Sequence, residues 1–584
     1  MRTAAYDKYP CVDAPTSSNV AWENWQAILH VLKERLAAVE KKRRVLVVDV
    51  YPGVDDQELL GALRVGLEPS CIINTIDLKK TESEVLQMIG RNLTSDRIFG
   101  VLSCHQLDEF FDPEKLNQAR RTIEKSKEGL VLVYGVGADL MAKGDLLVYA
   151  DLARWEIQLR YRRGLGNWGA DNGSEDFFRK YKRSFFVEWR VVDQHKFSRF
   201  DRVDYFLDTH VPNQPKLAEG QAVRDALRHA TTRPFRVVPF FDPAPWGGQW
   251  MKEVCGLDRS VKNFGWCFDC VPEENSLLIA LGSIRLELPS IDLVYQEPVR
   301  LLGDQVHARF GREFPIRFDF LDTMEGSHLS FQVHPLTEHI QQHFGMHYTQ
   351  DESYYILDAG PDARVYLGLQ ENVDPAAMTA DLYAAQRSAD RPFDADRYVA
   401  SWPTSKHDHF LIPAGTVHCS GRNSMVLEIS ATPYIFTFKM WDWGRLGLDG
   451  QPRPVHLEHG IANIQWDRDT SWVRANLVNR VTPVASGEGW SEERTGLHER
   501  EFIETRRHWF SGTVPHDTQG TVNVLNLVEG EEAIVESPSA SFAPFVVHYA
   551  ETFIVPAAVG RYTIRPHGQA VGKRCATMKA YVRS

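Results

Sequence analysis

The stretch SFQVHPLTEHIQQHFGMHYTQDESYYILDAGPDARVYLGL, residues 330–369, decides the fold of the C-terminal half of this 584-residue chain. Its short apolar runs are rich in branched and aromatic residues and are separated by Pro and Gly turns, a pattern typical of antiparallel β-structure. On a strand, side chains two residues apart leave the same face, so Gln332 and His334 point to one side. The segment PLTEHIQQHFG has helical spacing instead. The stretch therefore predicts a β-lobe that is interrupted by a helical insert.

The same β-rich rhythm extends from about residue 239 to the end of the chain. Short runs such as SLLIALGSIRLELPS, SMVLEISATPYIFTFKMW and ETFIVPAAVGRYTIRP are broken by turns, which is typical of a sandwich or barrel. A second helical insert is expected at DPAAMTADLYAAQRS. Because the β character repeats from about residue 490, we predict one lobe over 239–489 and a second over 490–584.

The first 210 residues have a different rhythm, in which helical patterns alternate with buried-strand patterns. WENWQAILHVLKERLAAVEKK and PEKLNQARRTIEKSK predict helices, whereas RVLVVDVY, IFGVLS and GLVLVYGV predict strands. Such alternation indicates a parallel α/β sheet, so residues 1–210 are predicted to form an α/β domain. The proline-containing stretch 211–238 is expected to be a linker.

Composition excludes several classes of partner. Lys and Arg total 66 and Asp and Glu total 78, so the formal charge is −12, which argues against nucleic acid and anionic membranes as partners. No apolar run approaches the length of a membrane span, and the N-terminus lacks a secretory pattern. The eight scattered cysteines are typical of reduced thiols, and the lone pair Cys267 and Cys270 is weak evidence for a metal site. We expect a cytoplasmic protein, and a homo-oligomer is compatible with the sequence.

Four side chains form a candidate metal site: Gln332, His334, Glu352 at the start of ESYYIL, and His418 in LIPAGTVHCSG. Neighbouring strands of a small barrel can bring such separated residues to one point. A divalent metal binds imidazole nitrogen and carboxylate oxygen and keeps a position open for water or substrate. Glutamine can bind through its carbonyl oxygen and suits zinc or manganese. Among 21 histidines, however, a given one is more often an ordinary hydrogen-bonded side chain.

The order QVHP, ESYYIL, PAGTVH resembles the class I mannose-6-phosphate isomerases, and the resemblance covers about residues 240 to 580. PWGGQW, VLEIS, TFKMWDWGR and RPVHLEHGI are similar to flanking parts of that family. The resemblance implies two cupin-like jelly-roll lobes and one divalent metal on the four residues, most simply zinc, with manganese and iron as alternatives. It also implies conversion of mannose 6-phosphate to fructose 6-phosphate, or of a related sugar, through a cis-enediol.

The same resemblance suggests residues for catalysis and recognition. Lys439 and Glu428 are candidates for acid–base catalysis, and Arg445 and His456 are candidates for contact with a sugar or sugar phosphate. Structural roles stay open: Arg445 could pair with Asp442 to fix a turn, Glu428 could support a metal ligand, and Lys439 could face solvent.

Three departures from the family alter the recognition residues and leave the metal ligands intact, and one of them is FGWCFDC in place of the family's early Gly-Glu motif. Thr349-Gln350-Asp351 stands where the family has Gly-Lys-Thr, and Lys439 stands where an arginine is usual.

Residues 40 to 210 resemble the P-loop kinases of the uridine-kinase type, with RVLVVDVYPGVDDQELLGAL at the place of the phosphate loop. A working loop needs a lysine and Ser or Thr, whereas this chain has Asp55 and Asp56, which would repel a triphosphate. We expect a kinase-like scaffold without kinase activity and no nucleotide. An arginine cluster could bind an anion, although a solvated helix face is favoured; it comprises Arg154, Arg160, Arg162 and Arg163.

Three functions therefore remain open from the sequence. A metal-dependent isomerase is preferred because the ligand quartet is complete. A metal-binding sugar-phosphate sensor without turnover is favoured by the missing lysine and the degenerate phosphate loop. A metal cupin with oxygenase chemistry would use the two-histidine, one-carboxylate face of His334, Glu352 and His418.

Overall fold

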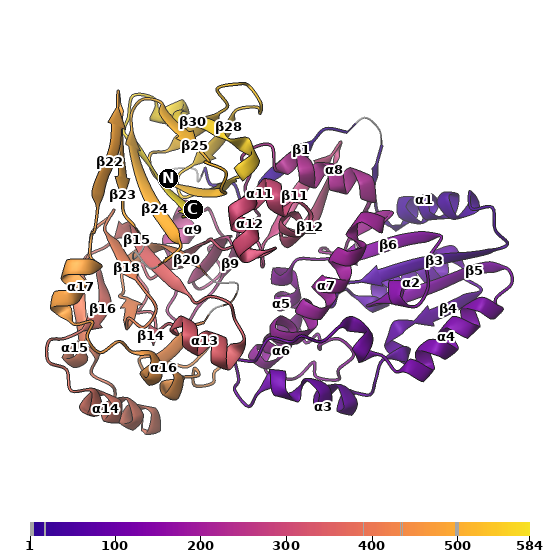
Figure 1. Ribbon diagram of the computed structural model, residues 1–584, viewed down its shortest axis with the longest axis horizontal. Coiled ribbons are helices and arrows are strands. Elements are labelled where there is room, and N and C mark those ends of the chain that lie inside the picture. Colours follow the sequence, from indigo (N-terminus) through magenta and orange to yellow (C-terminus); the bar gives the residue numbers. More distant parts are fainter. Residues whose placement is uncertain are drawn as a thin grey trace. The chain divides into compact units, whose positions relative to one another are not determined.

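The computed structural model describes residues 5–16, 19–388, 390–431, 434, 436–496 and 501–583. The chain forms two compact units, each built from separate stretches of sequence, and we treat each by itself (Figure 1). The β unit comprises Met1–Pro10, Thr231–Asn275 and Glu297–Ser584. The α/β unit comprises Cys11–Ala230 and Ser276–Gln296.

A seven-stranded sheet forms the centre of the α/β unit. Its strands lie in the order β2 (Ala21–Glu23), β8 (Lys216–Glu219), β7 (Tyr205–Asp208), β6 (Leu146–Asp151), β3 (Arg43–Val50), β5 (Gly129–Gly135) and β4 (Cys71–Asn74). The five strands from β7 to β4 run parallel, whereas β8 and β2 add an antiparallel edge. The predicted parallel α/β sheet is thus confirmed, and the buried apolar run of β3 lies near its middle.

Helices surround this sheet. Their bounds are α1 (Trp25–Ala37), α2 (Asp56–Leu67), α3 (Glu82–Leu93), α4 (Pro113–Lys125), α5 (Arg154–Arg162), α6 (Phe177–Arg183), α7 (Trp189–Arg199), α8 (Gly220–Ala230) and α10 (Ile291–Gln296). The two helices predicted from periodicity, α1 and α4, are confirmed. Asp112 caps α4 by accepting from two backbone amides, and Pro113 occupies its first turn, where a missing N–H costs nothing.

The linker predicted at 211–238 is wrong in its central part. Strand β8 pairs with β7, and α8 follows directly, with Val223 and Leu227 fully buried. The prolines lie outside both elements, so they mark the ends of regular structure and do not interrupt it.

The predicted strand at IFGVLS is also wrong. Phe99 is buried, but the backbone amide of Val101 donates to the carbonyl of Asn92, and that of Ser103 donates to the carbonyl of Phe186. The segment therefore satisfies its backbone against helical residues, because an apolar run of this length does not specify its hydrogen-bonding partner.

The run SLLIALGSIRLELPS forms two strands as predicted, but it belongs to the α/β unit and not to the β-lobe expected over 239–489. These strands, β11 (Ser276–Leu281) and β12 (Ile284–Pro289), form a three-stranded sheet with β1 (Cys11–Ala14). Strand β11 pairs in parallel with β1, across more than 260 residues of sequence. Hydrophobic alternation identifies a strand but not the sheet that it joins.

The first β-lobe holds the candidate metal ligands and consists of two antiparallel sheets. One sheet has the order β18 (His409–Ile412), β15 (Asp351–Ala359), β20 (Ser424–Ala431), β13 (Arg317–Asp322), β10 (Trp266–Cys270) and β9 (Phe240–Asp242). The other has the order β17 (Val399–Pro403), β16 (Arg364–Leu369), β19 (His418–Ser420), β14 (Phe331–Val333) and β21 (Phe438–Trp441).

The second β-lobe also has two antiparallel sheets. The larger one has the order β22 (Thr482–Gly487), β23 (Trp490–Arg494), β24 (Ile503–Phe510), β31 (Cys575–Val582), β26 (Asn523–Glu529) and β29 (Thr552–Val555). The smaller one has the order β25 (Val514–Asp517), β30 (Arg561–Pro566), β27 (Glu532–Glu536) and β28 (Phe545–His548). An apolar core between them includes Leu525, Val535, Phe553 and Ile564.

Short helices complete the β unit. They are α9 (Trp250–Val254), α11 (Pro298–Leu302), α12 (Asp304–Phe310), α13 (Thr337–Phe344), α14 (Pro375–Arg387), α15 (Ala395–Tyr398), α16 (Leu457–Asn463) and α17 (Thr470–Asn476). Both predicted inserts are confirmed, as α13 and α14. In the part of the chain that the structure describes, no helix combines the length and apolar character needed to cross a membrane.

Candidate metal centre

The four predicted metal ligands converge between the two sheets of the first β-lobe. Gln332 lies on β14 and is the direct cross-strand neighbour of His418 on β19, while His334 follows β14 by one residue. Glu352 comes from β15 in the other sheet. All four side chains are buried, and Glu352 and His418 are fully so.

Glu352 stands between the two imidazoles. Its Oε2 lies 3.1 Å from Nε2 of His334, and its Oε1 lies 2.9 Å from Nε2 of His418. Among the described residues, these three are the one group of at least three His, Cys, Asp or Glu side chains whose ligand atoms lie within 4.8 Å of one another.

Backbone carbonyls fix the orientation of both rings. Nδ1 of His334 lies 2.8 Å from the carbonyl oxygen of Phe436, and Nδ1 of His418 lies 2.9 Å from that of Thr416. Because a carbonyl can only accept, each Nδ1 carries a proton and donates it. In the neutral imidazole the lone pair is then on Nε2, which in both rings faces Glu352.

Burial and mutual contact shift the pKa values of these three groups in different directions. Burial alone would raise the pKa of Glu352, but its contacts with His334 and His418 outweigh burial and lower that pKa. Burial lowers the pKa of both imidazoles, and the charge of Glu352 reverses the direction for His334 but not for His418. An ionised carboxylate thus faces two imidazoles of which at least one is neutral.

Gln332 completes the donor set. Its Nε2 lies 3.1 Å from Nε2 of His418, and its Oε1 accepts from the Ser330 hydroxyl at 3.1 Å. Turning the amide by 180° exchanges these two atoms of similar size and brings the carbonyl oxygen beside the imidazole. Two imidazole nitrogens, one carboxylate and one amide oxygen fit a divalent cation such as zinc.

Gln350, one of the departures from the family pattern, supports two of these side chains at once. Its Nε2 donates to Oε2 of Glu352 at 3.0 Å, and its Oε1 accepts from the backbone amide of Phe436 at 3.0 Å. The carbonyl of Phe436 in turn accepts from His334. Gln350 therefore orients Glu352 directly and His334 through one backbone residue.

A cavity of about 50 Å³ adjoins the site. Its lining includes Gln332 together with both predicted acid–base residues, Glu428 on β20 and Lys439 on β21. Burial, followed by the negative charges of Glu352 and Asp319, raises the pKa of Glu428 well above its usual range. Lys439 is half-buried and is the cross-strand neighbour of Gln332. Glu428 and Lys439 therefore both line the cavity, and the alternative that Lys439 faces only solvent does not hold.

The two predicted recognition residues lie outside this lining. Arg445 donates to the Ser327 hydroxyl at 2.7 Å and to the His328 carbonyl at 2.6 Å, and it forms an ion pair with Asp442. It therefore fixes the turn after β21, as the structural alternative held. The ring of His456 is buried beside Phe438.

Three charged residues of the cavity were missed by sequence reasoning: Arg317, Asp319 and Arg453. Arg317 and Asp319 lie two apart on β13, and Asp319 is the cross-strand neighbour of Glu428. The alternation in RFDF, residues 317–320, with charges on one face and Phe on the other, was a usable signal. Arg453 lies 3.1 Å from Asp442, and no pattern distinguishes it from other arginines.

In the α/β unit, the loop at the place of a phosphate loop has its polar backbone groups hydrogen-bonded to side chains of the protein. Asp55 caps α2 by accepting from the amides of Gln57 and Glu58 at 3.0 and 3.1 Å, which are the donors that an anion would need. Nη1 of Arg160 donates to the carbonyl of Gly53 at 2.9 Å. A Cβ atom on Gly53 would lie 2.9 Å from the side chain of Ile157.

The solvated helix face that we favoured for the arginine cluster holds for Arg162 and Arg163, which are exposed, and is wrong for the other two arginines. Arg154 and Arg160 are each 8% exposed, and they pair with Asp193 and Glu156 respectively.

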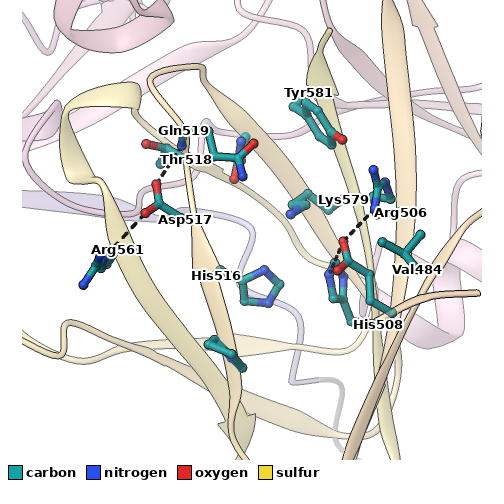
Figure 2. A pocket seen from close by; sticks show the side chains of 13 residues that line it. Val484, Arg506, His508, His516, Asp517, Thr518, Gln519, Arg561, Lys579 and Tyr581 are labelled. Carbon is teal, nitrogen blue, oxygen red and sulfur yellow. Dashed lines mark hydrogen bonds and ion pairs between the residues drawn. The ribbon is translucent and has the colours of Figure 1, made fainter. Parts of the chain in front are cut away.

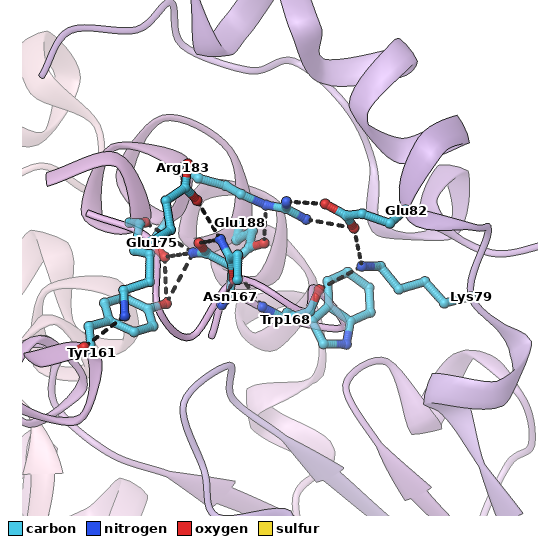
Figure 3. A network of polar contacts seen from close by, with 11 residues as sticks. Lys79, Glu82, Tyr161, Asn167, Trp168, Glu175, Arg183 and Glu188 are labelled. Atoms are coloured by element: carbon cyan, nitrogen blue, oxygen red, sulfur yellow. Dashed lines mark hydrogen bonds and ion pairs between the residues drawn. The ribbon is translucent and has the colours of Figure 1, made fainter. Parts of the chain in front are cut away.

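A neighbouring network, shown in Figure 3, likewise consists of mutually satisfied charges. Arg183 bridges Glu82 and Glu188, and Lys79 donates to the carbonyl of Trp168 at 2.6 Å. These cations already have protein partners.

The chain was compared with protein families, with curated proteins and with solved structures. A family model described as a domain of unknown function (DUF8485) matches residues 24–232. The chain is 22% identical over 333 residues to the probable mannose-6-phosphate isomerase GmuF of Bacillus subtilis (strain 168), which covers 57% of this chain and 96% of that protein. It is 26% identical over 218 residues to the mannose-6-phosphate isomerase of Streptococcus mutans serotype c (strain ATCC 700610 / UA159), covering 37% of this chain and 63% of that protein.

A solved structure of the mannose 6-phosphate isomerase from Bacillus subtilis has a TM-score of 0.48 with this chain at 17% identity, covering 60% of this chain and 99% of that one. Over more than half of its length, the chain is therefore similar in sequence to mannose-6-phosphate isomerases.

Proposed function

We propose that the chain is a metal-dependent aldose–ketose isomerase that interconverts mannose 6-phosphate and fructose 6-phosphate, or a closely related pair, through a cis-enediol. The convergence of His334, Glu352 and His418 in a buried site beside two acid–base groups carries this proposal. The relatives that share the sequence of this region are mannose-6-phosphate isomerases, which supports the choice of substrate class.

Gln332, His334, Glu352 and His418 would hold one divalent ion, most simply zinc. When bound, such an ion polarises the substrate's carbonyl and hydroxyl oxygens and stabilises the charge that develops on them. The protein's own contribution is to exclude water and to fix the rings through the carbonyls of Phe436 and Thr416.

We assign proton transfer to Glu428 and Lys439. An isomerase must move a proton between adjacent carbons and exchange protons on the neighbouring hydroxyls. Burial and the neighbouring carboxylates raise the pKa of Glu428, which favours its protonated form as a donor to a substrate oxygen. Lys439, on the adjacent wall, is the candidate for the carbon-bound proton.

Recognition of the substrate's anionic group is assigned to Arg453 in place of Arg445. Arg453 lines the cavity, whereas Arg445 holds Asp442, with which Arg453 pairs. The cavity of about 50 Å³ has room for only one or two water molecules, so binding of a sugar requires the lining to open. His456 remains a candidate contact once it has opened.

For the α/β unit we propose a kinase-like scaffold that has lost phosphate binding. The parallel order around β3 and the step from β3 through a short loop to α2 support the likeness. The Asp55 cap supports the loss, since it uses the amides that a phosphate would need.

The proposal is tested by measuring conversion of mannose 6-phosphate to fructose 6-phosphate together with bound metal, in the wild type and in His334→Ala. We expect both activity and metal to be lost in the variant. The matched control is His343→Ala, which removes an exposed histidine of α13. Bound metal without turnover of phosphorylated or free mannose would contradict the proposal and favour a sugar-phosphate sensor.

A further inference from the structure

The second β-lobe contains a cavity of about 650 Å³ that is separate from the metal centre (Figure 2). Its volume lies in the range of about 300–1,000 Å³ that is usual for small-molecule sites. The lining is almost entirely polar; it comprises Val484, Glu492, Arg506, His508, Pro515, His516, Asp517, Thr518, Gln519, Asn523, Arg561, Lys579 and Tyr581.

These side chains lie on strands that would normally supply an apolar interior. On β24 and β31, Arg506 and Lys579 are cross-strand neighbours, and His508 lies two residues from Arg506 on the same face. Elsewhere in the lobe, the space between the sheets is filled by an apolar core. Placing polar groups inside a sandwich is unfavourable unless partners compensate them, so this end of the lobe requires a separate explanation.

Two buried histidines at this end have ring nitrogens without a hydrogen-bond partner. His516 is 7% exposed, and in the described part of the chain neither of its ring nitrogens has one. His508 is 2% exposed; its Nε2 lies 3.4 Å from Oε1 of Glu492, whereas its Nδ1 has no partner among the described residues. His516 stacks on Tyr562 with ring centroids 4.8 Å apart, so its ring is held in place.

Lys579 brings a buried positive charge without an ion-pair partner to the same space. It is 8% exposed and its ammonium nitrogen lies 5.4 Å from the centre of the Tyr581 ring, but among the described residues it makes no hydrogen bond or ion pair. The neighbouring charges are already paired: Arg506 lies 3.2 Å from Glu492, and Arg561 lies 3.6 Å from Asp517. A buried ammonium without a partner is costly, and an anion in the cavity would remove that cost.

We propose that this cavity is a second ligand site, which binds a small oxygen-rich anion such as a phosphorylated or carboxylated sugar or polyol. Lys579 contributes the charge, and hydrogen bonds come from either ring nitrogen of His516 and from Nδ1 of His508, whose Nε2 already faces Glu492. Asn523, Gln519 and Tyr581 line the cavity and can bind hydroxyl groups. A bare cation does not fit, because Lys579 would repel it and, among the described residues, no three His, Cys, Asp or Glu side chains of this cavity bring ligand atoms within 4.8 Å of one another.

The test is calorimetric titration of the full metal-loaded chain with 6-phosphogluconate, gluconate and inorganic phosphate. We expect binding that is at least about ten-fold weaker in Lys579→Met, which removes the charge and keeps the length of the side chain. His516→Phe keeps the stack on Tyr562, removes both ring nitrogens and should also weaken binding. Lys573→Met, an exposed lysine of the same lobe that pairs with Glu531, should bind as the wild type does.

The probes also identify the anionic group. If gluconate binds as tightly as 6-phosphogluconate, the carboxylate is the group that the site recognises. If only 6-phosphogluconate and inorganic phosphate bind, the site recognises the phosphate group. Repeating the titrations in His334→Ala separates this site from the metal centre, since that variant should retain the second site. The proposal is overturned if the wild type binds none of the three probes, or if Lys579→Met binds them unchanged.

Discussion

Gln350 makes two hydrogen bonds that orient metal-site side chains, and its replacement by leucine removes both without changing the charge of the site. The bond to Glu352 is 3.0 Å long and the bond from the amide of Phe436 is 3.0 Å long. Leucine has nearly the same volume, so the expected effect comes from the lost bonds and not from a cavity.

The magnitude follows from the kind of bond that is lost. A hydrogen bond to an ionised group contributes about 1.5–3 kcal/mol, and every 1.4 kcal/mol is about ten-fold in an equilibrium constant. Replacement of groups that orient metal ligands weakens metal binding by about 10–100-fold. We therefore expect the metal affinity of Gln350→Leu to fall by one to two orders of magnitude.

Competition with a fluorescent chelator measures this affinity, and thermal unfolding of the metal-free protein measures any general loss of stability. Gln341→Leu, an exposed glutamine of α13, is the matched control and should leave the affinity unchanged. The reasoning is refuted if Gln350→Leu binds metal as the wild type does. It is also refuted if the variant loses stability equally with and without metal.

Three further predictions concern stability. Chelation of the metal should lower the Tm of the wild type, because an ion at a thousand times its Kd stabilises the fold by about 4 kcal/mol. The Tm of His334→Ala should not respond to the chelator. A wild-type Tm that chelation leaves unchanged would contradict the metal site. Burial lowers the pKa of Lys579 from 10.5 to about 8. Between these two pH values the unfolded chain binds more protons than the folded protein does. The free energy of unfolding therefore rises with pH over this interval, by about 3 kcal/mol. Lys579→Met should flatten this rise in denaturant titrations between pH 8 and pH 10.5, and a variant profile that matches the wild type would contradict the burial of an ammonium. Asp55→Ala should lower the free energy of unfolding by about 1 kcal/mol in denaturant titrations, since it removes the α2 cap; equal stability would show that the cap bonds are weak.

The convergence of the metal site could be predicted from the sequence because its residues lie in short motifs with strand spacing. Gln332 and His334 share a face by their separation alone, and the motifs around Glu352 and His418 matched a known order. The support from Gln350 could not be predicted in this way. Its two bonds depend on where Phe436 lies, and that residue is 86 positions away in sequence.

Other features depend on pairings that local sequence does not specify. The run containing β11 was predicted as a strand of the β-lobe, yet its partner β1 lies near the start of the sequence and both strands belong to the α/β unit. The polar cavity of the second lobe had a signal in ETRRHWF, where Arg506 and His508 occupy alternate positions. That signal indicates a cavity only once β24 is known to face β25, because the same alternation also describes a solvated strand face.

Turnover and metal content, measured on the same samples, test the central claim most directly. The wild type is assayed for conversion of mannose 6-phosphate to fructose 6-phosphate beside Glu352→Gln and His343→Ala. The account predicts stoichiometric metal and turnover in the wild type and in His343→Ala, and loss of both in Glu352→Gln. Turnover that persists in Glu352→Gln after the metal has been lost would contradict it, as would a wild-type protein that binds no metal.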